Sequence, residues 1–249
     1  MARRFDLSGR TILLTGGSSG VGAALAERLA ALDCKVVVWS RRPPDPAHPS
    51  LIHEPVDLAD TTALDGALDD LLARHPDLSV VINNAGISER GDLARSDPAT
   101  LDAHAEAQIA VNLRAPIRIC QRLFAPLSRL DSAMIVNNTS GLAVAPTVPH
   151  PVYCATKAGL RSFTQSMRYQ AEKVGGRLAI TEILLPVVET PMTASVPRGR
   201  MPVDKAADRI MRGLARAEPE IWVGQTALLR RLVGLSPALA RQLLKVATG

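Results

Sequence analysis

The sequence predicts an α/β protein built on a doubly wound parallel sheet of about seven strands, with helices on both faces. Two observations favour this class. Short apolar runs with the length of buried strands recur along the chain, and amphipathic helical patterns alternate with them. Polar or glycine-rich segments follow several of these runs. Strands that alternate with helices form parallel sheets with right-handed crossovers, so a ligand is expected at the carboxyl ends of the strands.

The first predicted strand, Thr11–Thr15, leads through GGSSGVG directly into the helical pattern AALAERLAAL. A strand, a glycine turn and a helix in this order indicate dinucleotide binding, because the N–H groups at the start of the helix can face a pyrophosphate. Gly16, Gly20 and Gly22 would supply the tight turn, the close approach and the helix packing.

The second predicted strand, KVVVWS, ends at Ser40 and is followed by Arg41 and Arg42. In dinucleotide folds an acidic residue at this place binds the ribose 2′-hydroxyl of NAD, whereas an arginine accommodates the 2′-phosphate of NADP. A serine can hydrogen-bond that phosphate and an arginine can offer it a planar fork of donors. The sequence therefore predicts NADP(H) as the cofactor.

Two further strands follow in the first half of the chain. LIHEPVDL is the third, with Asp57 just beyond its end, and after the helical segment ALDGALDDLLARH comes LSVVINNAG, the fourth. The pattern then predicts a long amphipathic helix from Thr100 to Leu127, disturbed near Pro116 because an interior proline removes one hydrogen bond. The apolar run MIVNNTS predicts the fifth strand and ends at Ser140.

Tyr153 and Lys157 stand four residues apart on a predicted helix and would share one face of it. A free phenol has a pKa of about 10, and a neighbouring cation can lower a pKa by roughly 1 to 3 units. Tyr153 would thereby become a usable acid or base near neutral pH. The Ser140 hydroxyl, at the carboxyl end of a strand, could donate to a substrate oxygen.

The last third of the chain contains two more predicted strands, RLAITEILLP and EIWVG, and the helix VDKAADRIMRGLAR between them. The segment VVETPMTASVPRGRMP has no clear periodicity and could be a lid or a surface loop. The C-terminal TALLRRLVGLSPALARQLLKV has helical spacing and favours helix packing or a subunit contact over membrane-surface binding.

Composition limits the remaining possibilities. The 249 residues are 47% hydrophobic with a formal net charge of +5, and no linker divides them, so residues 1–249 are predicted to form one domain. Basic residues are scattered and aromatics make up only 3%, which argues against nucleic-acid binding.

No run approaches the ~18 apolar residues of a membrane span. Cys34, Cys120 and Cys154 indicate neither disulfides nor a metal site and favour a reduced, cytoplasmic setting.

Several ordered motifs, TGGSSGVG, NNAG, VNL, NTSG and YCATK, together resemble the short-chain dehydrogenase/reductase superfamily over roughly residues 8–225. The resemblance implies a single Rossmann-type domain that uses NAD or NADP and forms a homodimer or homotetramer. The segment SGLAVAPTVPHPVYCATKAGLRSFTQSMR also resembles a narrower subgroup of bacterial reductases often named for D-alanine esterification of cell-wall polymers, which says little about the substrate.

The resemblance implies four catalytic residues, Asn112, Ser140, Tyr153 and Lys157. Tyr153 would act as acid or base, Ser140 would hold the substrate oxygen, and Lys157 would bind the nicotinamide ribose and lower the Tyr153 pKa. Asn112 would hold a water that links Lys157 to solvent. The cofactor-binding residues expected from the motifs and the resemblance are Gly16, Ser18, Ser19, Gly20, Val21, Ser40, Arg41, Arg42, Asp57, Leu58, Asn84, Ala85, Gly86, Tyr153, Lys157, Pro186, Val188 and Thr190.

Pro186 is followed by Val187, where the superfamily usually has glycine, which puts the flexibility of this loop in question. A substrate pocket is expected from residues 141–152 and 187–201. Its predicted apolar lining is Leu142, Val144, Val148, Met192 and Val196, and its few charges are Glu189, Arg198 and Arg200. This lining favours an apolar or mixed small molecule. His150 could gate the pocket, but its interpretation as an exposed loop residue is favoured, and Cys154 is interpreted as facing away from the site.

The predicted function is that of an NADP-dependent oxidoreductase acting between a ketone and a secondary alcohol, in the ketone-reducing direction. The alternatives are a redox-neutral enzyme, such as an epimerase or dehydratase, and a non-catalytic dinucleotide-binding sensor. A homo-oligomer is expected because two long helices, Thr100–Leu127 and Val152–Lys173, carry more apolar residues than one sheet face needs. The residues concerned are Ile117, Cys120, Phe124, Leu160, Phe163 and Met167.

Overall fold

The computed structural model describes residues 4–45, 48–196, 199–236, 238 and 242. Seven parallel strands form one sheet in the order β3-β2-β1-β4-β5-β6-β7. The strands are β1 (Thr11–Thr15), β2 (Lys35–Ser40), β3 (Leu51–Pro55), β4 (Leu78–Asn83), β5 (Ala133–Ser140), β6 (Leu178–Leu185) and β7 (Glu220–Trp222). The predicted fold class and all seven predicted strands are confirmed. The strand order reverses between β1 and β4, which is where such sheets bind ligands.

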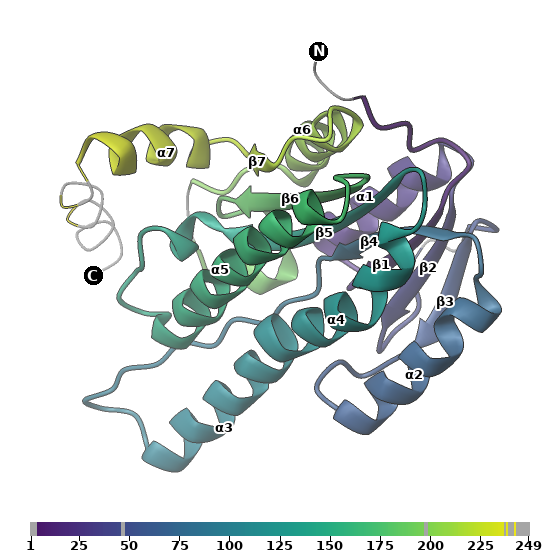
Figure 1. Ribbon diagram of the computed structural model, residues 1–249. Helices are drawn as coiled ribbons and strands as arrows, with labels where there is room; N and C mark the ends of the chain where they lie inside the picture. The colour runs from purple at the N-terminus through teal and green to yellow at the C-terminus, as the bar shows by residue number, and fades with distance from the viewer. Residues whose placement is uncertain (1–3, 46–47, 197–198, 237, 239–241, 243–249) are drawn as a thin grey trace.

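Helices cover both faces of the sheet (Figure 1). One face carries α1 and α6, and the other carries α2, α4 and α5. The helices are α1 (Gly20–Ala30), α2 (Thr61–Arg74), α3 (Pro98–Ile109), α4 (Ala115–Ser128), α5 (Pro151–Lys173), α6 (Val203–Ala215) and α7 (Thr226–Leu235).

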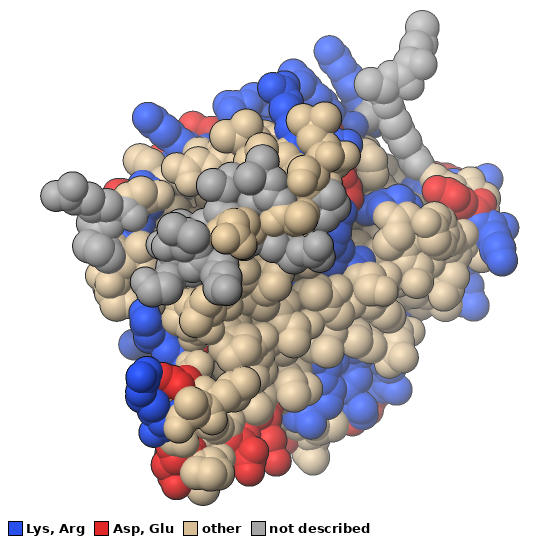
Figure 2. Space-filling view, turned by 90° about the vertical axis from the view of Figure 1, so that its left-hand side faces the viewer, with Lys and Arg blue, Asp and Glu red and all other residues tan. Residues whose placement is uncertain are grey.

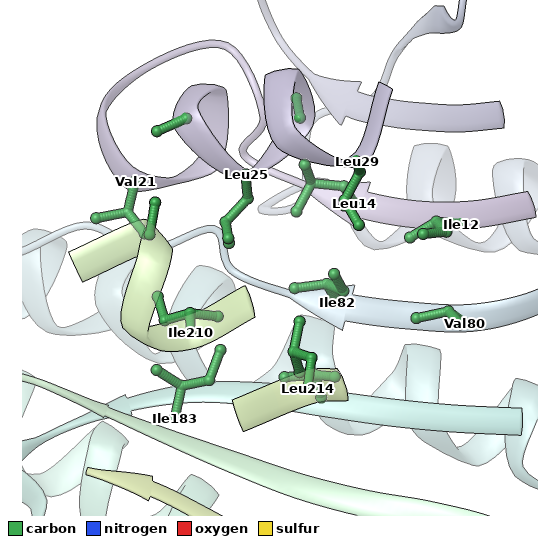
Figure 3. Close-up of a cluster of buried hydrophobic side chains, with 14 of the residues drawn as sticks. Ile12, Leu14, Val21, Leu25, Leu29, Val80, Ile82, Ile183, Ile210 and Leu214 are labelled. Atoms are coloured by element: carbon green, nitrogen blue, oxygen red, sulfur yellow. The ribbon is translucent and has the colours of Figure 1, made fainter. Parts of the chain in front are cut away.

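A hydrophobic core between the sheet and the helices α1 and α6 holds these two helices in place. Leu25 and Leu29 of α1 and Ile210 and Leu214 of α6 pack with Ile82 of β4, and all five are fully buried (Figure 3). Burying one such side chain contributes about 1.5–3 kcal/mol. This packing fixes the start of α1 against the carboxyl ends of the central strands.

The opposite core explains much of the apolar surplus expected on the two long helices. Cys120 of α4 and Leu160 and Met167 of α5 are buried within the chain itself. Phe124 and Phe163 are half-buried and pack against the same core. The expectation that all of these residues exceed the needs of one sheet face is therefore wrong for the three buried side chains, because α4 and α5 pack on the sheet and on each other.

The long helix predicted from Thr100 to Leu127 is divided by a widened turn, η1 (Ala110–Arg114), that joins α3 to α4. Ala115 N–H donates to Ala110 O, five residues back, which is π-helical geometry. Pro116 follows immediately and has no N–H to donate. The disturbance therefore lies just before the proline rather than at it, and it places Asn112 in the interior.

The predicted C-terminal helix is present as α7 over its first half, and residues 237, 239–241 and 243–249 lie outside the described part of the chain. Figure 1 shows α7 next to β7, at the edge of the sheet that β7 forms. Within the described ranges no helix is long and apolar enough to cross a membrane.

Candidate active site

A first cavity of about 300 Å³ lies at the carboxyl ends of the strands, between the start of α1 and the start of α5. All of the residues predicted to bind a cofactor line it. They are Gly16, Ser18, Ser19, Gly20, Val21, Ser40, Arg41, Arg42, Asp57, Leu58, Asn84, Ala85, Gly86, Tyr153, Lys157, Pro186, Val188 and Thr190. Residues from six different segments of the sequence thus converge on one cavity.

Glycines form the wall of the first cavity because the backbone passes too close for a side chain. A Cβ on Gly22 would lie 2.5 Å from Asn84 Nδ2 and closer still to Gly16 O. Gly16 and Gly20 have φ values of +67° and +54°, which side chains rarely allow. Ser19 precedes α1 without capping it through its side chain, so the first N–H groups of the helix remain available for an anion. These features fit a dinucleotide pyrophosphate.

A chain of hydrogen bonds between amides joins the ends of β1, β4 and β5. Asn84 Nδ2 donates to Thr15 O and to Gly16 O, each at 3.1 Å, and Asn138 Nδ2 donates to Asn84 Oδ1 at 3.0 Å. The Thr15 hydroxyl accepts from Asn84 N at 3.0 Å. Thr15 and Asn138 were not among the predicted site residues, although each is a polar residue in the last part of an apolar strand.

The end of the first cavity next to β2 is basic. Arg41 and Arg42 are exposed there, and the Ser40 hydroxyl donates to Arg42 O at 2.6 Å. The serine proton is thus used within the turn instead of pointing into the cavity, which differs from its expected role. Asp57 also lines this end, and its Oδ1 accepts from Ala59 N at 3.0 Å.

Tyr153 and Lys157 lie one turn apart on α5, beside Ser140 at the end of β5. The Lys157 Nζ atom is 5.8 Å from the centre of the Tyr153 ring and donates to Asn138 O at 2.8 Å. The side chains of Ser140 and Tyr153 are hydrogen-bonded to each other. Ser140 Oγ also accepts from Leu142 N at 3.1 Å, which fixes the hydroxyl at the mouth of the site. The structure therefore brings these three predicted catalytic residues together.

Burial acts against the ionised forms of both groups. It raises the pKa of Tyr153 to about 12, partly offset by the hydrogen bond with Ser140, and lowers the pKa of Lys157 to about 8. The net shift of the Tyr153 pKa is thus opposite to the predicted lowering, because loss of solvent around the phenol is its largest cause and Lys157 is not among its causes. The phenol is accordingly held in its neutral, proton-donating form near pH 7.

Asn112 is fully buried and lines neither cavity of the site. Its side-chain amide accepts from Ile87 N and donates to Ile87 O, both at 2.8 Å. It also donates to the Thr156 hydroxyl of α5 at 3.3 Å. The side chain thus ties η1 to the segment after β4 and to α5, and its expected water-holding role stays a prediction.

A second cavity of about 450 Å³ adjoins the first and shares Tyr153, Leu185, Pro186, Met192 and Thr193 with it. Of the predicted apolar lining, Leu142, Met192 and Val196 are present. The other two predicted apolar residues, Val144 and Val148, do not line it. Of the predicted charged residues, Glu189 and Arg200 do not line it either, and Arg198 lies outside the described residues. Val148 and Glu189, for example, turn to the surface.

Two parts of this second cavity were missed in the sequence. Gln225, Thr226 and Leu229 come from the start of α7, whereas Ser88 and Arg90 come from the loop after β4. No motif or periodicity marks these residues. His150 also lines the cavity and is half-buried, so its interpretation as an exposed loop residue is wrong.

Val187, in the place where glycine was expected, lines the second cavity without backbone strain. It is not among the described residues with a positive φ. Met201 N donates to Val187 O at 2.8 Å, and Val188 forms a parallel bridge with Met201. These contacts hold both ends of the 187–201 loop together, so a valine is tolerated here.

Comparisons with known proteins agree with this geometry. The family model for short chain dehydrogenases matches residues 10–200. A curated relative, an uncharacterized oxidoreductase of Bacillus subtilis named DltE, is 34% identical over 191 residues, covering 74% of this chain and 73% of the relative. A fatty acyl-CoA reductase of Mycobacterium tuberculosis is 32% identical over 94% of this chain and 79% of its own length.

Solved structures show the same fold. A short chain dehydrogenase from Burkholderia cenocepacia in complex with NADP has a TM-score of 0.84 at 21% identity, covering 96% of this chain and 99% of that one. One from Sphingobium yanoikuyae in complex with NADPH has a TM-score of 0.78 at 23% identity, covering 92% and 94%. The chain belongs to the short-chain dehydrogenase/reductase family. It is an oxidoreductase of this class.

Proposed function

We propose that the protein is an NADP-dependent oxidoreductase that transfers a hydride between the nicotinamide and a ketone or secondary alcohol, in the ketone-reducing direction. The observation that carries this proposal is the meeting of the two cavities at Tyr153. One cavity has the glycine-walled form of a dinucleotide site and the other has mostly apolar walls. A neutral phenol with a serine hydroxyl beside it stands where they join.

The residues at this junction can be assigned separate tasks. NADPH, when bound in the first cavity, supplies the hydride. The Ser140 hydroxyl donates to the substrate oxygen, and the Tyr153 phenol gives its proton to that oxygen as the charge develops. Lys157, fixed by Asn138 O, places a positive charge near the phenol and stabilises the phenolate that remains. The pKa of Lys157, about 8, leaves it mostly charged at pH 7.

The preference for NADP rests on this chain's own residues, because related folds have been solved with NADP, with NADPH and with NAD. Arg41 and Arg42 are exposed at the rim of the first cavity, and neither makes an ion pair within the described chain. Either guanidinium is free to bind a 2′-phosphate, and one such charge-assisted contact contributes about 1.5–3 kcal/mol.

The test measures kcat/KM for NADPH and NADH with a panel of ketones, in wild type and in the double variant Ser40→Asp, Arg41→Ala. We expect wild type to favour NADPH by roughly 10- to 100-fold and the double variant to lose or reverse this preference. A wild type that favours NADH would contradict the cofactor assignment. Product formation without net NADPH oxidation would point to the redox-neutral alternative, and binding without turnover to a sensor.

We further propose a cytoplasmic homodimer or homotetramer. The three cysteines are buried free thiols, which suits a reducing compartment. Ile117 and Phe124 of α4 and Phe163 of α5 remain half-buried and could be covered by a second subunit. Light scattering at micromolar concentration should give a dimer or tetramer mass, and a monomer mass would exclude this assembly.

A further inference from the structure

The second cavity combines apolar walls with the positive charge of an arginine at its edge. Its apolar lining includes Leu142, Met192, Val196 and Leu229. Arg90 also lines it, and no aspartate or glutamate does among the residues the structure describes. Arg90 is exposed at the edge of this cavity, so its guanidinium is accessible both to solvent and to a ligand in the cavity. An unpaired positive charge beside apolar walls attracts an anionic group.

The loop that carries Arg90 is held in place on both sides of the residue. Gly91 N donates to Pro149 O at 3.1 Å, and His150 Nδ1 lies 3.3 Å from Glu89 O and 3.1 Å from the Ser88 hydroxyl. The backbone of Arg90 is thus tied to the segment that begins α5. A ligand that used Arg90 would not have to order this loop first, which favours binding.

Arg90 forms no ion pair with any carboxylate in the described ranges, although other loop arginines do. Arg95, five residues further along the same loop, pairs with Asp92 at 3.1 Å. The helix α7, which also contributes to this cavity, contains Arg230 and Arg231 and no aspartate or glutamate. Glu89, next to Arg90, is exposed and does not line the cavity. Figure 2, which views this side of the molecule, shows a broad uncharged area bordered by Lys and Arg and, along its lower edge, also by Asp and Glu.

We propose that the second cavity recognises an apolar molecule with an anionic oxygen group, a carboxylate or a phosphate, and that Arg90 binds this group. The inference rests on the proposed function, under which the substrate is a ketone, and adds that this ketone has an apolar body and a terminal anion. Arg90 offers a planar pair of donors that matches either anion. The apolar body packs against the walls formed by Leu142, Met192 and Leu229, and the carbonyl points to Ser140 and Tyr153.

Binding tests this proposal without requiring turnover. Calorimetry on the NADP-bound protein compares octanoate, octyl phosphate and octanamide, in wild type, Arg90→Gln and the control Arg95→Gln. One charge-assisted contact predicts that wild type binds an octyl anion about 10- to 100-fold more tightly than octanamide. This ratio should fall close to one in Arg90→Gln and stay at the wild-type value in Arg95→Gln. The stronger of the two anions identifies the group.

Equal binding of the amide and both anions by wild type would overturn the proposal, as would an anion preference that survives in Arg90→Gln. Thermal unfolding of each variant shows whether it is folded. Turnover supplies a second comparison, between a medium-chain oxo acid and its methyl ester. We expect wild type to have a higher kcat/KM for the acid than for the ester, and Arg90→Gln to lose this difference. If no ketone of either kind oxidises NADPH while octyl anions bind through Arg90, the proposed function fails and the anion site stands.

Discussion

The two cavities of the site are built in different ways. The first is walled by backbone and by polar side chains at the ends of neighbouring strands, such as Asn84 and Asn138, which are hydrogen-bonded to each other. The second is walled by side chains from a loop after β4, the 187–201 loop and α7. Strand ends are fixed by the core, whereas loops and a terminal helix can change without unfolding the sheet. A substitution in the first cavity should therefore affect cofactor binding, and one in the second should affect only substrate.

The largest effect is expected where the cavities meet. Tyr153→Phe removes the transferable proton and keeps the ring, so kcat for ketone reduction should fall by about 10²- to 10⁴-fold. NADPH affinity, measured by fluorescence titration, should change little because the ring still fills its place. A variant that keeps wild-type turnover would remove Tyr153 from the mechanism.

Next comes a change confined to the first cavity. Gly22→Ala inserts a Cβ against Gly16 O and Asn84 Nδ2, and such overpacking costs typically about 1–3 kcal/mol. Much of this cost should appear as weaker NADPH binding, roughly 5- to 100-fold by titration. The matched control is Gly66→Ala in α2, where a Cβ would meet nothing within 4 Å.

Gly66→Ala should stabilise the protein, whereas Gly22→Ala should destabilise it and weaken NADPH binding. Gly66 is an exposed helix residue, so alanine there should raise the free energy of unfolding by about 0.5–1 kcal/mol and leave NADPH binding unchanged. Equal losses of NADPH affinity in Gly22→Ala and Gly66→Ala would mean that the glycine wall has no particular role.

Lys157 gives a pH-dependent prediction. Burial lowers its pKa from 10.5 to about 8, so between these values the unfolded chain retains a proton that the folded chain has lost. The free energy of unfolding should therefore rise with pH across this window. Lys157→Met should lack the rise and be more stable than wild type at pH 7, by on the order of 1–2 kcal/mol, while losing activity.

Chemical denaturation from pH 7 to 10 measures both slopes. Above pH 10 the opposite effect begins, because burial raises the pKa of Tyr153 to about 12 and the unfolded phenol ionises first. Parallel stability curves for wild type and Lys157→Met between pH 8 and 10 would show that the lysine is not held in an unfavourable, buried environment.

The smallest effect is expected in the second cavity. Leu229→Ala removes part of a half-buried side chain, worth about 1 kcal/mol of apolar contact, so KM for an apolar ketone should rise about 5-fold. The Kd of NADPH should remain within about 2-fold of wild type. A comparable loss of NADPH affinity would show that the two cavities are not separable in this way.

Sequence patterns predicted the first cavity well and the second poorly, for physical reasons. The first depends on what ends each strand, and apolar runs that close on Gly16, Ser40 or Asn84 are visible in one dimension. The place of Leu229 or Arg90 depends on how a loop and a helix return over the sheet, which no periodicity records. The pKa directions of Tyr153 and Lys157 were hidden as well, since spacing shows that they are neighbours and not how deeply both are buried.

Hydride transfer from NADPH to the substrate carbonyl can be followed with an isotope label. Wild-type protein is supplied with NADPH carrying deuterium at the transferred position and with an oxo acid, and the product is examined by mass spectrometry. We expect a secondary alcohol that carries the deuterium on its carbinol carbon, formed in step with NADPH oxidation, and almost none from Tyr153→Phe. A product without the label, or one that forms while NADPH is not consumed, would contradict this expectation.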